Sequence, residues 1–167
     1  MKMKKGFTLI ELVIVIVVIA VLGWVGVSAT LTAADSWLDM AQRKELIADG
    51  RLGLERILRE VRMVKDTTSV IEAAQTGFRF IDADDNDVKF SFNSGLVSRT
   101  KAGAANGLLG NVASFAFTYY DTNGLEIALP IVAPSATNIK RVKVSLSLSK
   151  APGRVSYLES GVSPRNL

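Results

Sequence analysis

The chemically most unusual group in the sequence is a single carboxylic acid, Glu11, inside a long apolar run. Between residues 7 and 27 the only other polar side chain is that of Thr8. A carboxylate in the hydrocarbon of a membrane costs roughly 2.5–3.5 kcal/mol even on lenient insertion scales. We therefore expect Glu11 to be functional and to need a partner that neutralises its charge.

A second group of acidic side chains follows a predicted strand at 78–81 and could bind a metal ion. Ca²⁺ takes about six to eight oxygen ligands, which carboxylates and amides supply. The spacing resembles an EF-hand only loosely, because the turn glycine and the final glutamate are missing. We favour a solvated hairpin turn, and we expect no metal and no other cofactor. The weak candidate ligands are Asp82, Asp84, Asp85, Asn86 and Asp87.

Nucleophilic catalysis has little support in the sequence. Ser98 to Lys101 and Ser147 to Lys150 both match Ser-x-x-Lys, but the companion motifs of that catalytic site are missing. The sequence also has no His, the commonest general base, and no Cys for a thiolate or a disulfide. We therefore predict that the protein is not an enzyme.

The composition indicates one domain with an appended apolar segment. The chain has 167 residues, and 49% of them are hydrophobic, many before residue 28. The net charge of +4 allows some affinity for anionic surfaces. DNA is therefore kept as a possible partner.

The apolar run at 7–27 is long enough to cross a membrane as a helix. About 20 residues at ~1.5 Å each match the ~30 Å hydrocarbon core of a bilayer. Lys2, Lys4 and Lys5 precede the run, whereas the first basic residue after it is Arg43. The positive-inside rule then predicts a cytoplasmic N-terminus and an exported remainder.

Two other interpretations of this run remain open at this point. A secretory signal could be cleaved near segment 27–29, VSA, although the run is longer than the usual ~7–15 residues and contains Glu11. A plain signal anchor explains the length of the run. It does not explain the glutamate.

The helix is expected to extend beyond the membrane, because no proline occurs between residues 7 and 64. Asp35 or Ser36 could instead cap a second helix that starts near Trp37. Gly23, Gly26, Gly50 and Gly53 mark either bends or close contacts with other elements. An apolar stripe at helical spacing predicts a face directed toward a core. Its members are Leu54, Ile57, Leu58, Val61 and Val64.

After residue 65 the apolar pattern changes to period 2, which predicts antiparallel strands. Residues 70–76 are read as a short connection and 101–111 as a loop of small residues. Packing of one apolar sheet face on the helix stripe gives an α+β fold. The predicted strands are 78–81, 88–92, 96–99, 112–120 and 139–149, with shorter ones possible at 125–129 and 155–158.

Segment 5–12, KGFTLIEL, resembles the processing motif of type IV prepilins and type II secretion pseudopilins. The resemblance implies that a membrane peptidase cuts after Gly6 and methylates the new N-terminal residue, Phe7. Glu11 then occupies the acidic position of the family. The implied parts are a leader at 1–6, a transmembrane and filament-core helix at 7–27, a periplasmic amphipathic helix at 28–65 and an antiparallel β domain at 66–167.

The rest of the chain is similar to minor pilins and pseudopilins of the PilW and PulJ kind. The similarity rests on the acidic turn in the first hairpin, FAFTYY at 115–120, RVKV at 141–144 and the ending RNL. The membrane segment lacks the proline, and the C-terminus the Cys pair, of many major pilins. These differences point to a minor subunit.

The resemblance implies a structural role in a type IV pilus or a type II secretion pseudopilus. The chain would be stored in the inner membrane and then incorporated into a filament in the periplasm or at the cell surface. An ammonium on Phe7 of one subunit would pair with Glu11 of the next. The implied partners are prepilin peptidase, other major and minor pilins or pseudopilins, and the inner-membrane assembly platform. The alternative is a filament-anchored binding module for DNA or a surface ligand.

Overall fold

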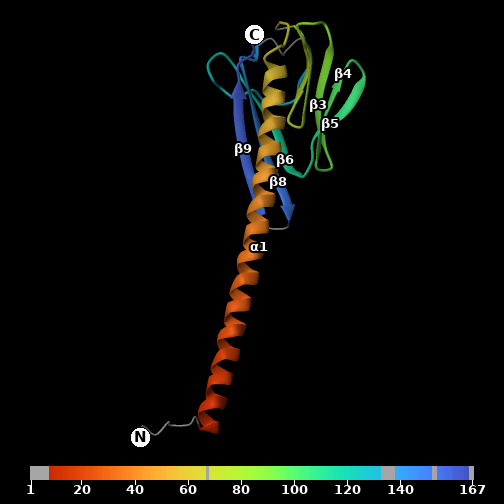
Figure 1. Cartoon of the computed structure of the whole chain (residues 1–167). Helices are drawn as coiled ribbons and strands as arrows, with labels where there is room; N and C mark the ends of the chain where they lie inside the picture. The colour runs from red at the N-terminus through yellow and green to blue at the C-terminus, as the bar shows by residue number, and fades with distance from the viewer. Residues whose placement is uncertain (1–7, 67, 133–137, 152–153, 166–167) are drawn as a thin grey trace. The chain divides into compact units, whose positions relative to one another are not determined.

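The structure is a computed structural model that describes residues 8–66, 68–132, 138–151 and 154–165. Within these residues it contains one helix and nine strands (Figure 1). The chain forms two compact units, Met1–Lys44 and Glu45–Leu167. The helix α1 (Leu9–Val61) supplies the first unit and continues into the second. The predicted α+β class, one long N-terminal helix with antiparallel strands, is confirmed.

Helix α1 continues through the position where a second helix was considered. Asp35, Ser36 and Trp37 all lie inside it, so the prediction of a separate helix capped there is wrong. The helix ends at Val61, a little before the predicted residue 65. Val64 lies beyond the helix and forms a β-bridge with Asp82.

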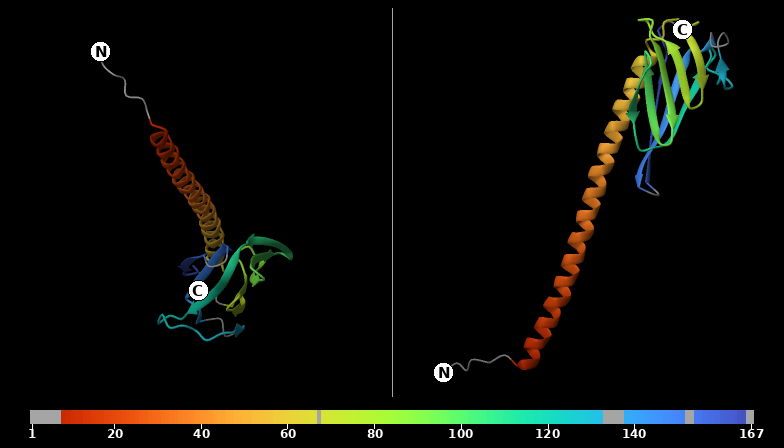
Figure 2. Two further views of the ribbon diagram at one scale, coloured as in Figure 1. Left: turned by 90° about the horizontal axis from the view of Figure 1, so that it is seen from below. Right: turned by 90° about the vertical axis from the view of Figure 1, so that its right-hand side faces the viewer.

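The larger sheet has six strands in the order β5-β4-β3-β2-β1-β7, all antiparallel to their neighbours. β1 to β5 follow one another as consecutive hairpins, and in Figure 2 the green strands of this sheet lie side by side. The strands predicted at 78–81, 88–92 and 96–99 are confirmed. The bounds are β1 (Val70–Ala74), β2 (Gly77–Ile81), β3 (Asp87–Asn93), β4 (Leu96–Lys101), β5 (Ala104–Leu109) and β7 (Ile131–Val132).

A smaller sheet holds three antiparallel strands, with β8 (Arg141–Ala151) between β6 (Val112–Tyr120) and β9 (Arg154–Val162). These three confirm the strands predicted at 112–120, 139–149 and 155–158. The prediction of one sheet was incomplete, since the strands divide between two. The inward side chains of β8, Val142, Val144, Leu146 and Leu148, are buried as predicted, but Ser147, between two of them, is buried as well.

The prediction of a loop over residues 101–111 is wrong, because β5 lies inside it. Ala102 and Gly103 have φ of 50° and 82° and form the turn that returns the chain alongside β4. Small residues have low intrinsic preference for strands. Backbone pairing with β4 therefore forms β5, rather than the side chains of β5 itself.

Two further short segments differ from expectation. Residues 70–76, read as a connection, contain β1, which pairs with β2 on one side and β7 on the other. The short strand considered at 125–129 is absent from this described segment, where Glu126 makes only an isolated bridge to Tyr120. The next strand, β7, begins at Ile131 and pairs with β1.

The predicted helix stripe and the aromatic side chains of both sheets form one buried cluster. Phe78 of the larger sheet lies 5.8 Å from Phe117 and 5.4 Å from Tyr119 of the smaller one, between ring centroids. The Tyr119 hydroxyl donates to the carbonyl oxygens of Ala74 (3.1 Å) and Gly77 (3.2 Å). The turn between β1 and β2 is thus bonded directly to β6.

Gly50 and Gly53 mark close contacts with β-structure. A Cβ atom on Gly50 would collide with Leu148 Cδ1 and lie 2.8 Å from Leu158 Cδ1, while one on Gly53 would lie 3.2 Å from Leu109 Cδ1. Of the two roles considered for these glycines, the close contact is confirmed. Gly23 and Gly26 have no such neighbour within 4 Å.

Gly50→Ala is therefore expected to lower the free energy of unfolding through overpacking by about 2–3 kcal/mol, the upper part of the usual range, because the added Cβ meets two leucine side chains. The gain in helix propensity, about 1 kcal/mol, offsets only part of this loss. Urea unfolding of the detergent-solubilised chain measures the difference. Gly110→Ala is the control, because a Cβ there has no neighbour within 4 Å. Equal stability of the two variants would contradict the close contact.

Candidate functional site

The N-terminal end of α1 carries the first candidate site. Glu11 lies in the first turn of the helix, with its side chain exposed. Gly6 and Phe7, the predicted cleavage and methylation residues, lie outside the described residues. Glu11 is therefore the one member of this set whose surroundings can be described.

Thr8 and Glu11 form a reciprocal cap at the start of α1. The Thr8 backbone N–H and hydroxyl lie 3.3 and 3.4 Å from Glu11 Oε2, and the Glu11 N–H lies 3.4 Å from Thr8 Oγ1. This is a capping box, which satisfies two backbone donors that a helix leaves unpaired at its N-terminus. The capping box was not predicted, although the pattern Thr-x-x-Glu before an apolar run is typical of one.

The helix after this cap exposes an almost entirely apolar surface. The large hydrophobic side chains from Leu9 to Val27 are 45–82% exposed. By length and composition α1 qualifies as a membrane-spanning helix, with a mean hydropathy of 2.9 over its most apolar 18 residues. None of that window is buried by the rest of the described chain. Such a surface needs either lipid or other helices around it.

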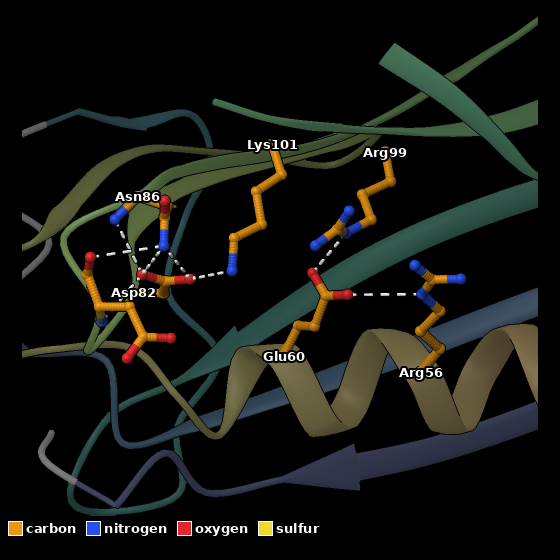
Figure 3. A network of polar contacts seen from close by, with 7 residues as sticks. Arg56, Glu60, Asp82, Asn86, Arg99 and Lys101 are labelled. Atoms are coloured by element: carbon orange, nitrogen blue, oxygen red, sulfur yellow. Dashed lines mark hydrogen bonds and ion pairs between the residues drawn. The ribbon is translucent and has the colours of Figure 1, made fainter. Parts of the chain in front are cut away.

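The acidic turn between β2 and β3 is the second candidate site (Figure 3). Asp82 is buried, and its Oδ1 accepts hydrogen bonds from the backbone N–H groups of Asp84 (3.0 Å) and Asn86 (2.9 Å). The Asn86 side-chain amide lies 3.1 Å from the same oxygen. Lys101 Nζ, from β4, lies 2.7 Å from Oδ2. The carboxylate thus binds groups of the protein itself.

The other acidic candidates of this turn are distributed away from Asp82. Asp85 pairs with Lys65, and Asp87 forms a two-oxygen contact with Arg79, closest at 2.6 Å. Asp84 is exposed. Within the described part of the chain, His, Cys, Asp and Glu side chains form no group of three or more that could hold a metal ion.

Hydrogen bonds and nearby charges stabilise the charged forms of Asp82 and Asp87. Burial alone raises the pKa of Asp82, but the hydrogen bonds from Lys101 and Asn86 outweigh it, so its pKa lies below the ordinary value. The hydrogen bond from Arg79 lowers the pKa of Asp87, against a smaller opposing effect of burial. Both groups are therefore ion-pair anions at neutral pH.

A second ion cluster joins the helix to the larger sheet (Figure 3). Glu60 accepts a hydrogen bond from Arg99 of β4 at 2.6 Å and pairs more loosely with Arg56, one helical turn away, at 3.5 Å. The Arg99 and Glu60 side chains are only 14% and 17% exposed. This contact fixes the end of α1 against β4.

One residue of each Ser-x-x-Lys pattern has a structural partner. Lys101 pairs with Asp82, and the Ser147 hydroxyl shares a 2.6 Å hydrogen bond with that of Ser114 on the neighbouring strand. Ser147 is buried in this position. The lysine and serine that were considered as catalytic groups thus take part in contacts that connect strands.

Comparison with known proteins bears on the first of these sites. Residues 1–27 match the family model described as the prokaryotic N-terminal methylation motif. The match covers Gly6, Phe7 and Glu11 together with the apolar run that follows them. No curated protein matches the chain.

Proposed function

We propose that this chain, whose methylation motif supports membership of the type IV pilin and pseudopilin family, is a minor subunit that helps to initiate or build the filament. The observation that carries the proposal is the motif at residues 1–27, joined to an exposed apolar helix. The motif supports processing by prepilin peptidase and assembly with other pilins. The filament would be a type IV pilus or a type II secretion pseudopilus.

The exposed apolar surface of α1 supports two successive environments. Lipid surrounds it while the subunit is stored in the inner membrane, and the helices of other subunits surround it in the filament. The three lysines before residue 6 support a cytoplasmic N-terminus. Cleavage after Gly6 removes them, so the helix keeps no cationic segment that would hold it at the cytoplasmic surface.

A charge pair between subunits supports assembly in register. Processing leaves an ammonium on Phe7, and Glu11 offers a carboxylate four residues further along the chain. Either charge alone is costly among apolar helices, whereas a pair is compatible with them. Pairing of Phe7 with Glu11 of the next subunit therefore sets the axial position of each new subunit.

The role is proposed to be structural rather than enzymatic. In the globular unit, the candidate groups Asp82 and Lys101 pair with each other, while Asp87 pairs with Arg79 and Ser147 with Ser114, and each of these contacts connects two elements. Support for a minor subunit comes from the sequence, which lacks a C-terminal Cys pair and a proline in the membrane segment.

The mature N-terminus is the direct test of this function. Mass analysis of the full chain purified from membranes is expected to find a first residue of methylated Phe7. A start near Thr30 would instead indicate a secreted domain, and an intact Met1 would indicate a plain membrane anchor. Either result would contradict the proposal.

Gly6→Ala is expected to abolish processing, because the peptidase motif requires a residue without a side chain before the cleaved bond. The unprocessed chain would retain Lys2, Lys4 and Lys5 and migrate as the longer form on a denaturing gel. Gly23→Ala is the control, since it replaces a glycine of α1 that has no neighbour within 4 Å and lies away from the cleaved bond. Normal maturation of Gly6→Ala would exclude the assigned cleavage residue.

A further inference from the structure

Hydroxyl side chains follow the apolar run of α1, and all are hydrogen-bonded within the helix itself. Each donates to a backbone carbonyl three or four residues earlier. The bonds are Ser28 Oγ to Trp24 O at 3.0 Å, Thr30 Oγ1 to Val27 O at 2.8 Å, Thr32 Oγ1 to Ser28 O at 3.0 Å and Ser36 Oγ to Thr32 O at 2.9 Å.

These bonds extend the surface that hydrocarbon can cover. A hydroxyl is costly in lipid only when it lacks a hydrogen-bond partner, and these hydroxyls carry their partners with them. The other residues between 28 and 34 are alanine and leucine. The lipid-compatible surface of α1 therefore continues past Val27 to Ala34, and Asp35 is the first charged residue beyond it.

The N-terminal end of the helix sets the other boundary. The capping box of Thr8 and Glu11 is a polar helix start, suited to a surface that meets water. A span over 7–27 would bury this cap and its carboxylate in hydrocarbon. A span over 12–34 leaves both at the surface, and its ~35 Å length matches the ~30 Å core with a modest tilt.

The position of Trp37 is consistent with the same placement, in which Trp24, 77% exposed, lies near the middle of the span. Its side chain is 78% exposed, and it lies just beyond Asp35. Tryptophan is enriched where a membrane helix meets the headgroups. In the placement over 12–34, Trp37 lies at that level, whereas a span ending at residue 27 would leave it about 15 Å outside the hydrocarbon.

We propose that, before assembly, bilayer hydrocarbon contacts residues 12–34 of α1 and that the cap formed by Thr8 and Glu11 lies at the membrane surface. The proposal depends on the proposed function only in treating α1 as a membrane helix.

Single-cysteine labelling tests the placement, because the natural sequence contains no cysteine. The full chain is reconstituted into vesicles of phosphatidylethanolamine and phosphatidylglycerol, so that lipid is the only partner, and treated with a membrane-impermeant maleimide. Thr30→Cys and Ala33→Cys are expected to react at least tenfold more slowly than Ala41→Cys. Equal rates at the three positions would overturn the proposal.

The N-terminal boundary of the span, next to the cap formed by Thr8 and Glu11, is tested in the same vesicles with Ile10→Cys and Ile14→Cys. Ile10→Cys is expected to react promptly in the molecules whose N-terminus faces outward, and Ala41→Cys in those with the opposite orientation. Ile14→Cys should be protected in both orientations. Protection of Ile10→Cys equal to that of Ile14→Cys would overturn the surface position of the cap.

Mass analysis of cells separates this proposal from the proposed function. Mature chains that start at methylated Phe7, together with rapid labelling at residues 30 and 33, would refute the placement and leave the function intact. Protection at both positions, together with an unprocessed Met1, would support the placement and refute the function.

Discussion

Replacement of Asp82 with alanine is expected to lower the free energy of unfolding of the globular unit by about 3 kcal/mol. Breaking a buried ion pair typically costs about 3–5 kcal/mol, because the remaining charge loses its partner. The lower end of this range applies here, because the Lys101 side chain is 31% exposed and water can hydrate its ammonium group once Asp82 is removed. Urea unfolding of the detergent-solubilised chain, followed by near-ultraviolet circular dichroism, measures the loss.

The expected cost follows from how many elements the Asp82 carboxylate joins. It accepts two backbone N–H groups of its own turn, and Lys101 reaches it from β4. Its backbone also bridges to Val64, just after α1. Alanine keeps this backbone bridge but leaves the turn and β4 without their shared acceptor, and each unpaired buried donor adds to the loss.

Asp84→Ala is the matched control. It removes a carboxylate of the same turn, but one whose side chain is exposed and whose backbone N–H still reaches Asp82. We expect a change of less than about 0.5 kcal/mol. If Asp84→Ala were as destabilising as Asp82→Ala, the network described for Asp82 would not explain its effect.

The pH dependence of stability gives an independent check on Asp82. Its pKa is lowered in the folded state, so its contribution is present above the ordinary value near 3.9 and is lost as pH falls through the folded pKa. The amide side chain in Asp82→Asn does not titrate in this range of pH. The stability gap between the natural chain and Asp82→Asn is therefore expected to narrow below about pH 4. A constant gap would contradict the lowered pKa.

Glu11→Ala is expected to be processed normally but to enter filaments at least tenfold less than the natural chain. The peptidase acts at Gly6, whereas the carboxylate is needed later, to neutralise the Phe7 ammonium of a neighbour. Loss of about 1.4 kcal/mol at that contact corresponds to a tenfold change in equilibrium. Quantitative immunoblots of membranes and of sheared or cross-linked filaments measure the two steps.

Two matched variants separate the charge of Glu11 from its role in the helix cap. Glu11→Gln keeps an acceptor that can cap the helix but removes the charge, so incorporation should fall as in Glu11→Ala. Thr8→Ala removes the cap, at about 1 kcal/mol of helix stability, and keeps the charge. Its incorporation should stay near that of the natural chain. Normal incorporation of Glu11→Gln would exclude the proposed charge pair.

The strongest periodic patterns of the sequence predicted the fold correctly. Val142, Val144 and Leu146 alternate with polar residues, and β8 forms there with those side chains buried. The helix stripe from Leu54 to Val64 was identified from its spacing, and its apolar members are buried. In both cases the side chains alone decide which face turns toward the core.

The strands that were missed are those whose own side chains do not specify them. β5 begins with alanine, alanine and asparagine, and β1 includes Glu72. Pairing with β4 forms the first, and pairing with β2 and β7 forms the second. The division into two sheets likewise depends on pairings between distant residues, which no local pattern reports.

The two candidate sites also differ in whether local sequence patterns could predict their contacts. The capping box of Thr8 and Glu11 is local and could have been identified from Thr-x-x-Glu. The pairing of Asp82 with Lys101 spans 19 residues and depends on the register of β2, β3 and β4. That register was not predicted, so the acidic turn could be considered as a metal site until Lys101 was located beside it.

The hydrogen bonds from Tyr119 have a consequence for the order of folding. If the segment after α1 is exported in the order of its sequence, β1 to β5 emerge before β6, and each can pair with the strand next to it in sequence, which makes their association fast. Tyr119 arrives later, in β6, and its hydroxyl donates to Ala74 and Gly77, which flank the first hairpin turn. Because β6 binds the turn of the first hairpin, the globular unit is expected to gain its full stability only after β6 has joined it.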